Sequence, residues 1–336
     1  MKIYESNGLV WEYDVLDSKK KTVEIKGLQN CGETVEIPSS INGYRVDSIG
    51  ADAFFNKKQL KSVIIPDSVT IIFDNAFRES GLEAVEIPAS VETIWDFAFE
   101  GCKSLKTIYI GRNVDKWPGN PDDIHVTSFR RAVFANCSNL ETVVVGDHLF
   151  RNFKVDLFAG CDKFSKFTSF PDGKYIKVSN NLLVYINCKS IEYAPHTLTS
   201  VTIPSDVESI EPGAFFRCEK LVKFKVEKYN NCFTAKDGIL YDKSGKTLVR
   251  CPVGLESVVI PDGVTKIGAY AFYGCKKLES ITIPSSVSKI EKYAFSCCRR
   301  LSNIIIPNNM IKISKTAFNK CDSLNQSDKI DNNSEE

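Results

Sequence analysis

Cysteine is the residue type with the most chemical potential in this chain, since 336 residues include twelve cysteines but only three histidines. Zinc sites usually need closely spaced C-x-x-C pairs, and the sequence has none. Seven cysteines instead follow a Phe by three residues: Cys102, Cys137, Cys161, Cys218, Cys275, Cys298 and Cys321. We expect these seven to be reduced structural thiols, because side chains that point the same way are poorly placed to form a disulfide. Five others lie outside this spacing, and their pairing cannot be deduced: Cys31, Cys188, Cys232, Cys251 and Cys297.

The remaining chemical motifs are incomplete. Ser244-Gly245-Lys246-Thr247 resembles the end of a phosphate-binding loop, but that motif requires Gly where Leu240 stands. A turn between two strands explains this segment better. Asp122, Asp123 and His125 suggest a metal site only weakly, and a solvated loop explains them better. The sequence therefore predicts no enzyme, no cofactor and no metal.

A repeat of 23 residues positions most of these side chains. Leu255, Leu278, Leu301 and Leu324 each start such a repeat. After the Leu come alternating Val or Ile residues, a Pro, further inward Val and Ile residues, and then an Ala-Phe pair before the cysteine. The alternation predicts a half-buried strand that Pro ends, followed by a turn or short helical segment. A period of this length predicts a solenoid, because one repeat buries too little surface to fold alone.

Four segments depart from this period. The step from Leu60 to Leu82 is 22 residues, whereas two later steps are 34 residues. The extra residues of the long steps, 180–195 and 237–252, each show two apolar runs around a polar turn, which is typical of a β-hairpin. Residues 115–131 interrupt the array once and are predicted to be a loop.

These departures and the chain ends suggest three segments. We assign residues 1–34 to an N-terminal β-hairpin cap, because the first coil of an array has one bare face. Residues 35–324 form a solenoid of about 11 repeats of 23 residues, two of them lengthened to 34. Residues 325–336 are a polar tail that we expect to be disordered.

The block from Ile283-Pro284 through Ala294-Phe295 to Cys298 resembles the repeats of the BspA-like leucine-rich repeat family. The first repeat, 37–54, and the Gly-Ile-Leu-Tyr hairpin, 238–241, are similar to that family too, and the resemblance extends over residues 8–324. It implies an α/β repeat solenoid, curved and right-handed, with a parallel sheet on the concave face. It also implies non-enzymatic protein binding, since members are typically microbial surface proteins, including adhesins that bind host matrix proteins.

Charge and hydropathy narrow the classes of partner. The 43 Lys and Arg balance 42 Asp and Glu, so bulk electrostatics do not favour nucleic acid or an anionic membrane. No apolar stretch of about 18 residues predicts membrane insertion. Residues 1–8 do not resemble a signal peptide. We expect a protein partner whose identity the sequence does not reveal, and a location at the cell surface or outside if a leader was removed, otherwise in the cytoplasm.

Candidate binding residues fall on three surfaces. The outward positions of the predicted strands include Tyr109, Val144, Thr202, Lys223, Lys225 and Thr282. The loop contributes Trp117, Phe129, Arg130 and Arg131, which are residue types frequent in binding hot spots. A basic edge consists of Lys276, Lys277, Arg299 and Arg300. Each surface also has a structural explanation that involves no partner. β-branched residues suit any sheet, and a loop can pack on the solenoid. A basic edge can be a solvated rim.

Two functional hypotheses remain. The leading one is a protein-binding repeat module that acts in cell adhesion or in contact with host or matrix proteins. The alternative is an intracellular scaffold or regulator built on the same solenoid, which the reduced thiols and the N-terminal sequence favour.

Overall fold

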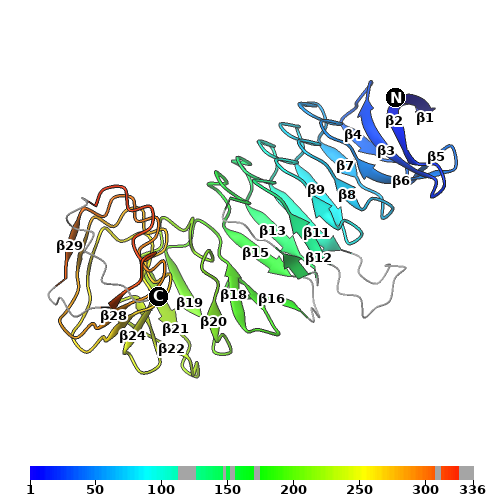
Figure 1. Cartoon of the computed structure of the whole chain (residues 1–336). Coiled ribbons are helices and arrows are strands. Elements are labelled where there is room, and N and C mark those ends of the chain that lie inside the picture. Colours follow the sequence, from blue (N-terminus) through cyan, green and yellow to red (C-terminus); the bar gives the residue numbers. More distant parts are fainter. Residues whose placement is uncertain (113–125, 147–148, 152–155, 170–174, 307–311, 325–336) are drawn as a thin grey trace. The chain divides into compact units, whose positions relative to one another are not determined.

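The computed structural model describes residues 1–112, 126–146, 149–151, 156–169, 175–306 and 312–324. The chain divides into two compact units, 1–181 and 182–336, each a stack of strand-and-turn coils (Figure 1). Every regular element in the described ranges is a β-strand, which corrects the α/β class expected above. The turns explain this difference: residues such as Asn75 (φ 55°) and Phe97 (φ 61°) adopt a positive φ, and a right-handed helix cannot continue through such a residue.

Antiparallel strands close the N-terminal end of unit 1. β1 (Lys2–Ser6) pairs with β2 (Leu9–Asp17), and β2 pairs with β3 (Thr22–Leu28). Trp11 on β2 is 1% exposed, and its ring lies edge-on at 6.4 Å from Phe54, the first aromatic ring of the repeat. The hairpin therefore covers the core of the first coil, which would otherwise face water.

Each coil of unit 1 adds a strand to each of two parallel stacks. The first stack starts two residues after the repeat leucine or its equivalent and comprises β4 (Thr34–Glu36), β7 (Ser62–Ile64), β9 (Ala84–Pro88), β11 (Thr107–Arg112), β13 (Thr142–Val145) and β15 (Lys166–Ser169). The second comprises β6 (Tyr44–Ile49), β8 (Ile71–Ile72), β10 (Thr93–Ile94), β12 (Val126–Phe129) and β14 (Leu149–Arg151). β5 (Ser40–Ile41) pairs with β6, and β16 (Ile176–Ser179) is the last strand of the unit.

One part of the predicted loop is a strand. β12 lies inside 115–131 and pairs in parallel with β10, with Thr93 opposite Ser128. Ser128 donates its N–H to the Glu92 carbonyl at 2.8 Å, so the coil regains its ordinary register immediately after the interruption. Residues 113–125 lie outside the described part of the chain, so this correction concerns 126–129.

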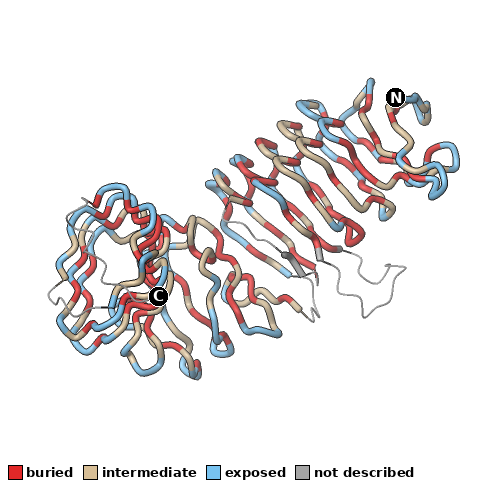
Figure 2. Tube along the Cα trace, in the orientation of Figure 1, coloured by how far each residue is buried: buried red, intermediate tan, exposed pale blue. Residues whose placement is uncertain are grey.

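A column of phenylalanine rings fills the core of unit 1. Phe54, Phe77, Phe99, Phe134 and Phe158 stack with successive centroid distances of 4.9, 5.0, 5.2 and 5.8 Å. These distances are close to the spacing of paired strands, because each ring belongs to the next coil. Buried positions recur along every coil in Figure 2, as the periodic pattern predicted.

Unit 2 repeats this plan with two insertions. One stack contains β19 (Ser200–Ile203), β21 (Lys223–Val226), β25 (Ser257–Val259), β27 (Ser280–Thr282) and β29 (Asn303–Ile305). The other includes β20 (Ser209–Ile210), β26 (Lys266–Ile267), β28 (Lys289–Ile290) and β30 (Lys312–Ile313). The long repeats contribute the antiparallel pairs β17 (Leu182–Tyr185) with β18 (Ser190–Tyr193), and β23 (Ile239–Asp242) with β24 (Thr247–Arg250), where hairpins were predicted.

The seven in-phase cysteines have a shared structural role. All seven are buried, and most donate their thiol to a carbonyl of the preceding coil: Cys102 to Phe77 at 3.1 Å and Cys298 to Phe272 at 3.1 Å are examples. Burial raises the pKa of the Cys218 thiol to about 12, so it is a poor nucleophile near neutral pH. The structure holds all twelve cysteines as free thiols, and among the five outside the column only Cys188 is exposed.

Candidate binding surfaces

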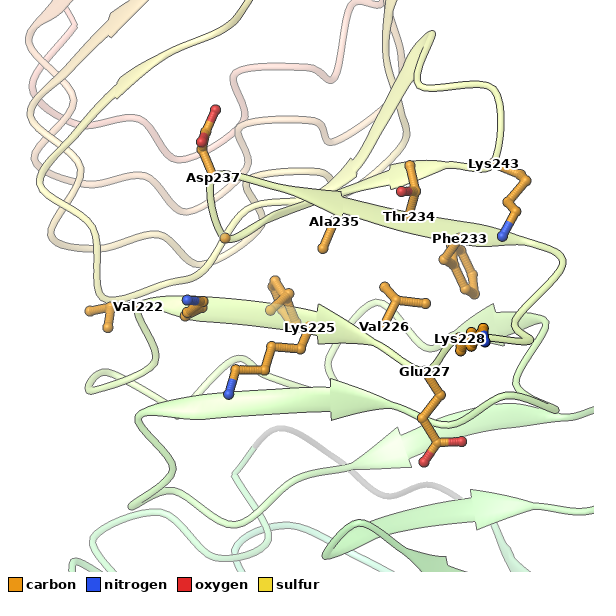
Figure 3. A pocket seen from close by; sticks show the side chains of 13 residues that line it. Val222, Lys225, Val226, Glu227, Lys228, Phe233, Thr234, Ala235, Asp237 and Lys243 are labelled. Carbon is orange, nitrogen blue, oxygen red and sulfur yellow. The ribbon is translucent and has the colours of Figure 1, made fainter.

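Within the described residues, each unit has a pocket on the outward side of its strands. The larger, which we call the lysine pocket, has a volume of about 620 Å³ and lies between β21 and β22 (Phe233–Lys236) of unit 2 (Figure 3). The smaller, which we call the acidic pocket, has a volume of about 430 Å³ and lies over β7, β9 and β11 of unit 1. Both volumes fall within the usual range for ligand sites.

The lysine pocket exists because the second long repeat interrupts the parallel sheet. β21 pairs with β19, whereas β25, which starts after the next repeat leucine, belongs to a separate sheet with β27 and β29. Between them the extra residues form β22, which pairs with β23 on its other side. Within the described residues, one main-chain bond joins β21 to this hairpin: the Phe224 N–H donates to the Gly238 carbonyl at 2.8 Å. The two strands are therefore neighbours without a hydrogen-bond ladder.

Asn230 holds the turn that connects β21 to β22. Its side chain is fully buried, and Nδ2 donates to the carbonyls of Pro204 (2.8 Å) and Val207 (2.9 Å). Its Oδ1 accepts the N–H groups of Cys232 (2.9 Å) and Phe233 (2.7 Å). One amide thus satisfies four main-chain groups, and it ties the turn to the preceding coil.

The lining of the lysine pocket combines an apolar floor with a positive rim. Phe233, Ala235 and Val226 point into the space between the two strands in Figure 3. The charged lining residues are four lysines and two carboxylates: Lys223, Lys225, Lys228, Lys243, Glu227 and Asp237. The pocket therefore carries an excess of two positive charges.

Two of these charged groups already have partners in the protein. Lys243 Nζ donates to the Asn230 carbonyl at 2.5 Å, and Glu227 accepts the Ser205 N–H at 2.7 Å. Lys223 and Lys225 are both exposed on the outward face of β21. Lys228 is exposed as well, and its Nζ lies 5.4 Å over the Tyr229 ring.

The acidic pocket arises at the short repeat. The sheet containing β9, β11, β13 and β15 does not extend to β7, which pairs with β4 instead. Ile64, 53% exposed, and Tyr109 provide apolar surface, and the charged residues that line the pocket are Asp67 and Glu86. This pocket is therefore negative where the lysine pocket is positive.

The outward residues proposed from the sequence lie on the strands as expected. Lys223, Lys225 and Thr282 are exposed, while Tyr109, Val144 and Thr202 are half-buried. The structure places Lys223 and Lys225 in the lysine pocket and Tyr109 in the acidic pocket. Whether any of them binds a partner stays a prediction.

Much of the predicted basic edge is paired with carboxylates. Lys276 Nζ lies 3.4 Å from Glu219 and 5.0 Å above the Phe216 ring. Arg299 lies 3.8 Å from Asp322, and Arg300 pairs with Glu279. Lys277 is half-buried. These ion pairs make a solvated rim the simpler interpretation of this edge.

The predicted loop surface is only partly present in the described residues. Trp117 lies outside them, and Phe129 is fully buried, so its ring offers no surface to a partner. Arg130 and Arg131 are exposed, and their guanidinium groups lie 4.9 Å over the Trp95 ring and 5.5 Å over the Phe97 ring. Cation–π contacts of this kind order the two arginines on the side of the solenoid.

Sequence reasoning missed the half-buried aromatic residues of the turns. Phe73 and Trp95 stack at 6.0 Å in unit 1, and Tyr270 and Tyr293 stack at 5.3 Å in unit 2. Each occupies one of the three variable positions between the repeat Ile and the Ala-Phe pair. Aromatic residues at those variable positions were the signal available in the sequence.

The described residues also bear on metal binding and membrane insertion. No group of three or more His, Cys, Asp or Glu side chains there is arranged to hold a metal ion. The described ranges also contain no apolar helix of the length that a membrane span requires.

Comparison with known proteins assigns the family. The model of the BspA-type leucine-rich repeat region matches residues 23–120, 121–192, 185–248 and 242–335, and the chain belongs to this family. A leucine-rich repeat protein from Eubacterium ventriosum is similar in structure, with a TM-score of 0.53 and 20% identity over 95% of this chain and 88% of that one. A leucine-rich cell surface protein from Faecalibacterium prausnitzii has a TM-score of 0.47 and 23% identity over 96% and 87%. No curated protein matches the chain.

Proposed function

We propose that this leucine-rich repeat protein is a non-enzymatic binding module that engages a protein partner through the outward face of its parallel strands. The lysine pocket carries this proposal, because it combines apolar floor, exposed charge and a rigid frame in one place. Rigidity favours binding because little conformational entropy is lost when the partner docks. Buried Asn230, which holds the turn between β21 and β22, and the stacked rings of Phe272, Phe295 and Phe318 in the following coils supply that rigidity.

We further propose that the partner is an extracellular matrix or host protein and that the chain acts at the cell surface. The resemblance of its repeats to those of surface adhesins supports this finer statement. The intracellular scaffold is the second candidate, because the buried thiols of the cysteine column suit a reducing compartment. Antibody staining of intact and permeabilised source cells separates the two, since only a surface protein stains intact cells.

A binding experiment tests the surface itself. The full chain, immobilised for surface plasmon resonance, is expected to bind at least one of a panel of purified matrix proteins. Lys225→Glu or Tyr109→Ser should weaken that binding by about tenfold, depending on which pocket is used. Lys312→Glu, an exposed lysine on β30, is the control and should bind as the wild type does. Binding that neither pocket variant changes would contradict the outward face as the interface.

A further inference from the structure

We propose that the lysine pocket binds a sulfated glycan chain, which lies over the outward face of β21 and is held by ion pairs between its sulfate groups and the pocket lysines. The inference rests on the proposed binding function of the outward face and names the chemical group that the partner would present there. Three features of the pocket carry it: an excess of positive charge along one strand, lysines that are already held in place, and main chain that is closed to an added strand.

The excess charge follows the course of β21. Lys223 and Lys225 stand two residues apart, so both project from its outward face with a separation of about 7 Å along the strand. Lys228 follows soon after the strand, which gives the spacing Lys-x-Lys-x-x-Lys. None of the three forms an ion pair with a residue that the structure describes. Lysines gathered in so short a stretch are typical of patches that bind heparin or nucleic acid.

The two carboxylates of the lining do not cancel this charge. Glu227 points away from β22 in Figure 3, and its Oε2 accepts the Ser205 N–H at 2.7 Å. Asp237 lies at the opposite end of the pocket from Lys228 and Lys243 in the same view. One carboxylate is therefore turned away and engaged with the protein, and the other is remote from two of the lysines.

Two lysines of the pocket are held in place before any ligand arrives. Lys243 Nζ donates to the Asn230 carbonyl at 2.5 Å, and Lys228 Nζ lies 5.4 Å over the Tyr229 ring. An ammonium group has three N–H donors, so Lys243 keeps two for a ligand. Asn230 is itself fixed by four hydrogen bonds of its side chain. Little side-chain entropy is therefore lost when an anion binds at this end of the pocket.

The main chain of the pocket is closed to an added strand. β21 pairs with β19 on one side, and on the other side the Phe224 N–H reaches the Gly238 carbonyl of the hairpin. A ligand must therefore lie across the outward face and be held by side chains. Hydroxyl groups accompany the lysines on that face, since Ser200 stands opposite Lys223 on β19 and Thr234 of β22 lines the pocket.

Among polyanions, a sulfated glycan suits this face best. Its sulfate groups stand on sugar rings, so binding fixes fewer rotatable bonds than binding of the acidic side chains of a peptide does. Its ring hydroxyls can also pair with the hydroxyl groups beside the lysines. Single-stranded nucleic acid draws much of its affinity from bases that stack on aromatic rings. Phe224 and Phe233, the aromatic residues of the lining, are only 1% and 6% exposed and offer no such platform.

The lysines have another physical explanation, in which they only keep the surface soluble. Binding of a polyanion would then depend on the total charge of the protein and not on the position of each lysine. Two variants with the same net charge, one changed inside the pocket and one outside it, separate the two explanations.

The experiment measures fluorescence anisotropy of a labelled heparin hexasaccharide against the full chain. We expect saturable binding that weakens when salt is raised from about 50 to about 200 mM, because salt screens exposed charges. Lys223→Glu/Lys225→Glu should weaken binding by about tenfold or more, since two attractive charges become repulsive. Lys312→Glu/Lys315→Glu makes the same change of net charge at exposed positions outside the pocket and should stay within about twofold of the wild type. Equal losses in the two double variants would overturn the inference in favour of total charge.

A conservative variant shows that the loss is ionic and not a failure to fold. Lys223→Arg/Lys225→Arg keeps both charges and should bind within about threefold of the wild type. Circular dichroism spectra of all variants should coincide. An arginine variant that binds as weakly as the glutamate variant would contradict the ionic role of the two lysines.

Two other ligands test the chemistry of the anion. A desulfated hexasaccharide keeps its carboxylates and hydroxyl groups but loses its sulfates, so it should bind much more weakly. Equal binding of the desulfated ligand would overturn the role of sulfate. A thymidine oligonucleotide that carries as many charges should also bind more weakly, and tighter binding than that of heparin would overturn the inference in favour of nucleic acid.

Matrix proteins stripped of their glycans test the proposed function separately. If a stripped protein binds as well as the intact one and heparin does not bind, this inference fails and the proposed function stands. If heparin binds while no stripped protein of the panel does, the proposed protein partner fails and the glycan site stands.

Discussion

The two pockets arise from opposite changes in the length of a repeat. In unit 1, the step from Leu60 to Leu82 lacks one residue, and the sheet breaks between β7 and β9. In unit 2, the step from Leu221 to Leu255 gains a hairpin, and the sheet breaks after β21. The regular repeats therefore build a frame, whereas the pockets appear where repeat length changes. Their charges differ because Asp67 and Glu86 line the first and four lysines line the second.

The largest expected effect comes from the residue that shapes the lysine pocket. Asn230→Ala should lower the free energy of unfolding of unit 2 by about 3–5 kcal/mol, because two buried carbonyls and two N–H groups lose their partner. Urea denaturation of the full chain, followed by a signal from unit 2, measures the loss. Asn231→Ala, at the exposed neighbouring position, is the control and should change stability by less than about 0.5 kcal/mol. Equal effects of the two variants would refute the role assigned to Asn230.

The short repeat of unit 1 depends on a glycine in the same way. A Cβ at Gly81 would lie 2.0 Å from the Lys58 carbonyl oxygen, which is main chain and cannot move aside freely. Gly81→Ala should therefore destabilise unit 1 by about 2–3 kcal/mol and disturb the acidic pocket, with little effect on the lysine pocket. At Gly32 an added Cβ meets only the Thr34 carbonyl oxygen at 3.8 Å, an ordinary contact, so Gly32→Ala serves as the control. Thermal unfolding of both variants compares their stabilities. A Gly81→Ala protein as stable as Gly32→Ala would contradict the predicted destabilisation of unit 1.

A smaller effect, on the pH dependence of stability, should distinguish the first hairpin of unit 2 from the second. Burial, with help from Glu211, raises the pKa of Glu192 to about 7, whereas burial, with help from Arg217, lowers the pKa of His196 to about 4. The contribution of Glu192 to the free energy of unfolding is complete below about pH 4.5 and is lost as pH rises through 7. The His196 contribution is complete above about pH 6.5 and is lost as pH falls through 4. The two opposing slopes overlap, so the wild type should show a flat stability profile in between.

Single variants should reveal the two slopes. From about pH 5 to about pH 8, Glu192→Gln should gain about 1–2 kcal/mol of stability relative to the wild type. His196→Asn should remove the opposing slope, so this variant should gain stability relative to the wild type as pH falls from about 6.5 towards 4. The second hairpin has Val249 and Val253 where the first has Glu192 and His196, so Val249→Ala should keep the wild-type pH profile. Parallel profiles for all four proteins would show that these groups do not govern pH dependence.

Sequence reasoning located the features that repeat. The column of Phe rings, the buried cysteines, the outward strand positions and both hairpins follow from spacing along the chain, since each repeat meets the same neighbours in every coil. It failed where one coil differs from the next. It placed Phe129 on a binding loop, although the residue closes β12 and is buried, and it gave Asn230 no role.

What the sequence determined by itself is the period and the inward or outward direction of the side chains that recur in each repeat. Both depend on local alternation and on the stacking of equivalent residues in successive coils. The tertiary structure alone decided where the sheets break, which lysines share a pocket and which of the edge cations are paired with carboxylates. These features depend on register between strands more than twenty residues apart in sequence, such as Lys223 opposite Ser200. A change in repeat length alters that register at a single coil, and its consequence appears only when neighbouring coils are packed together.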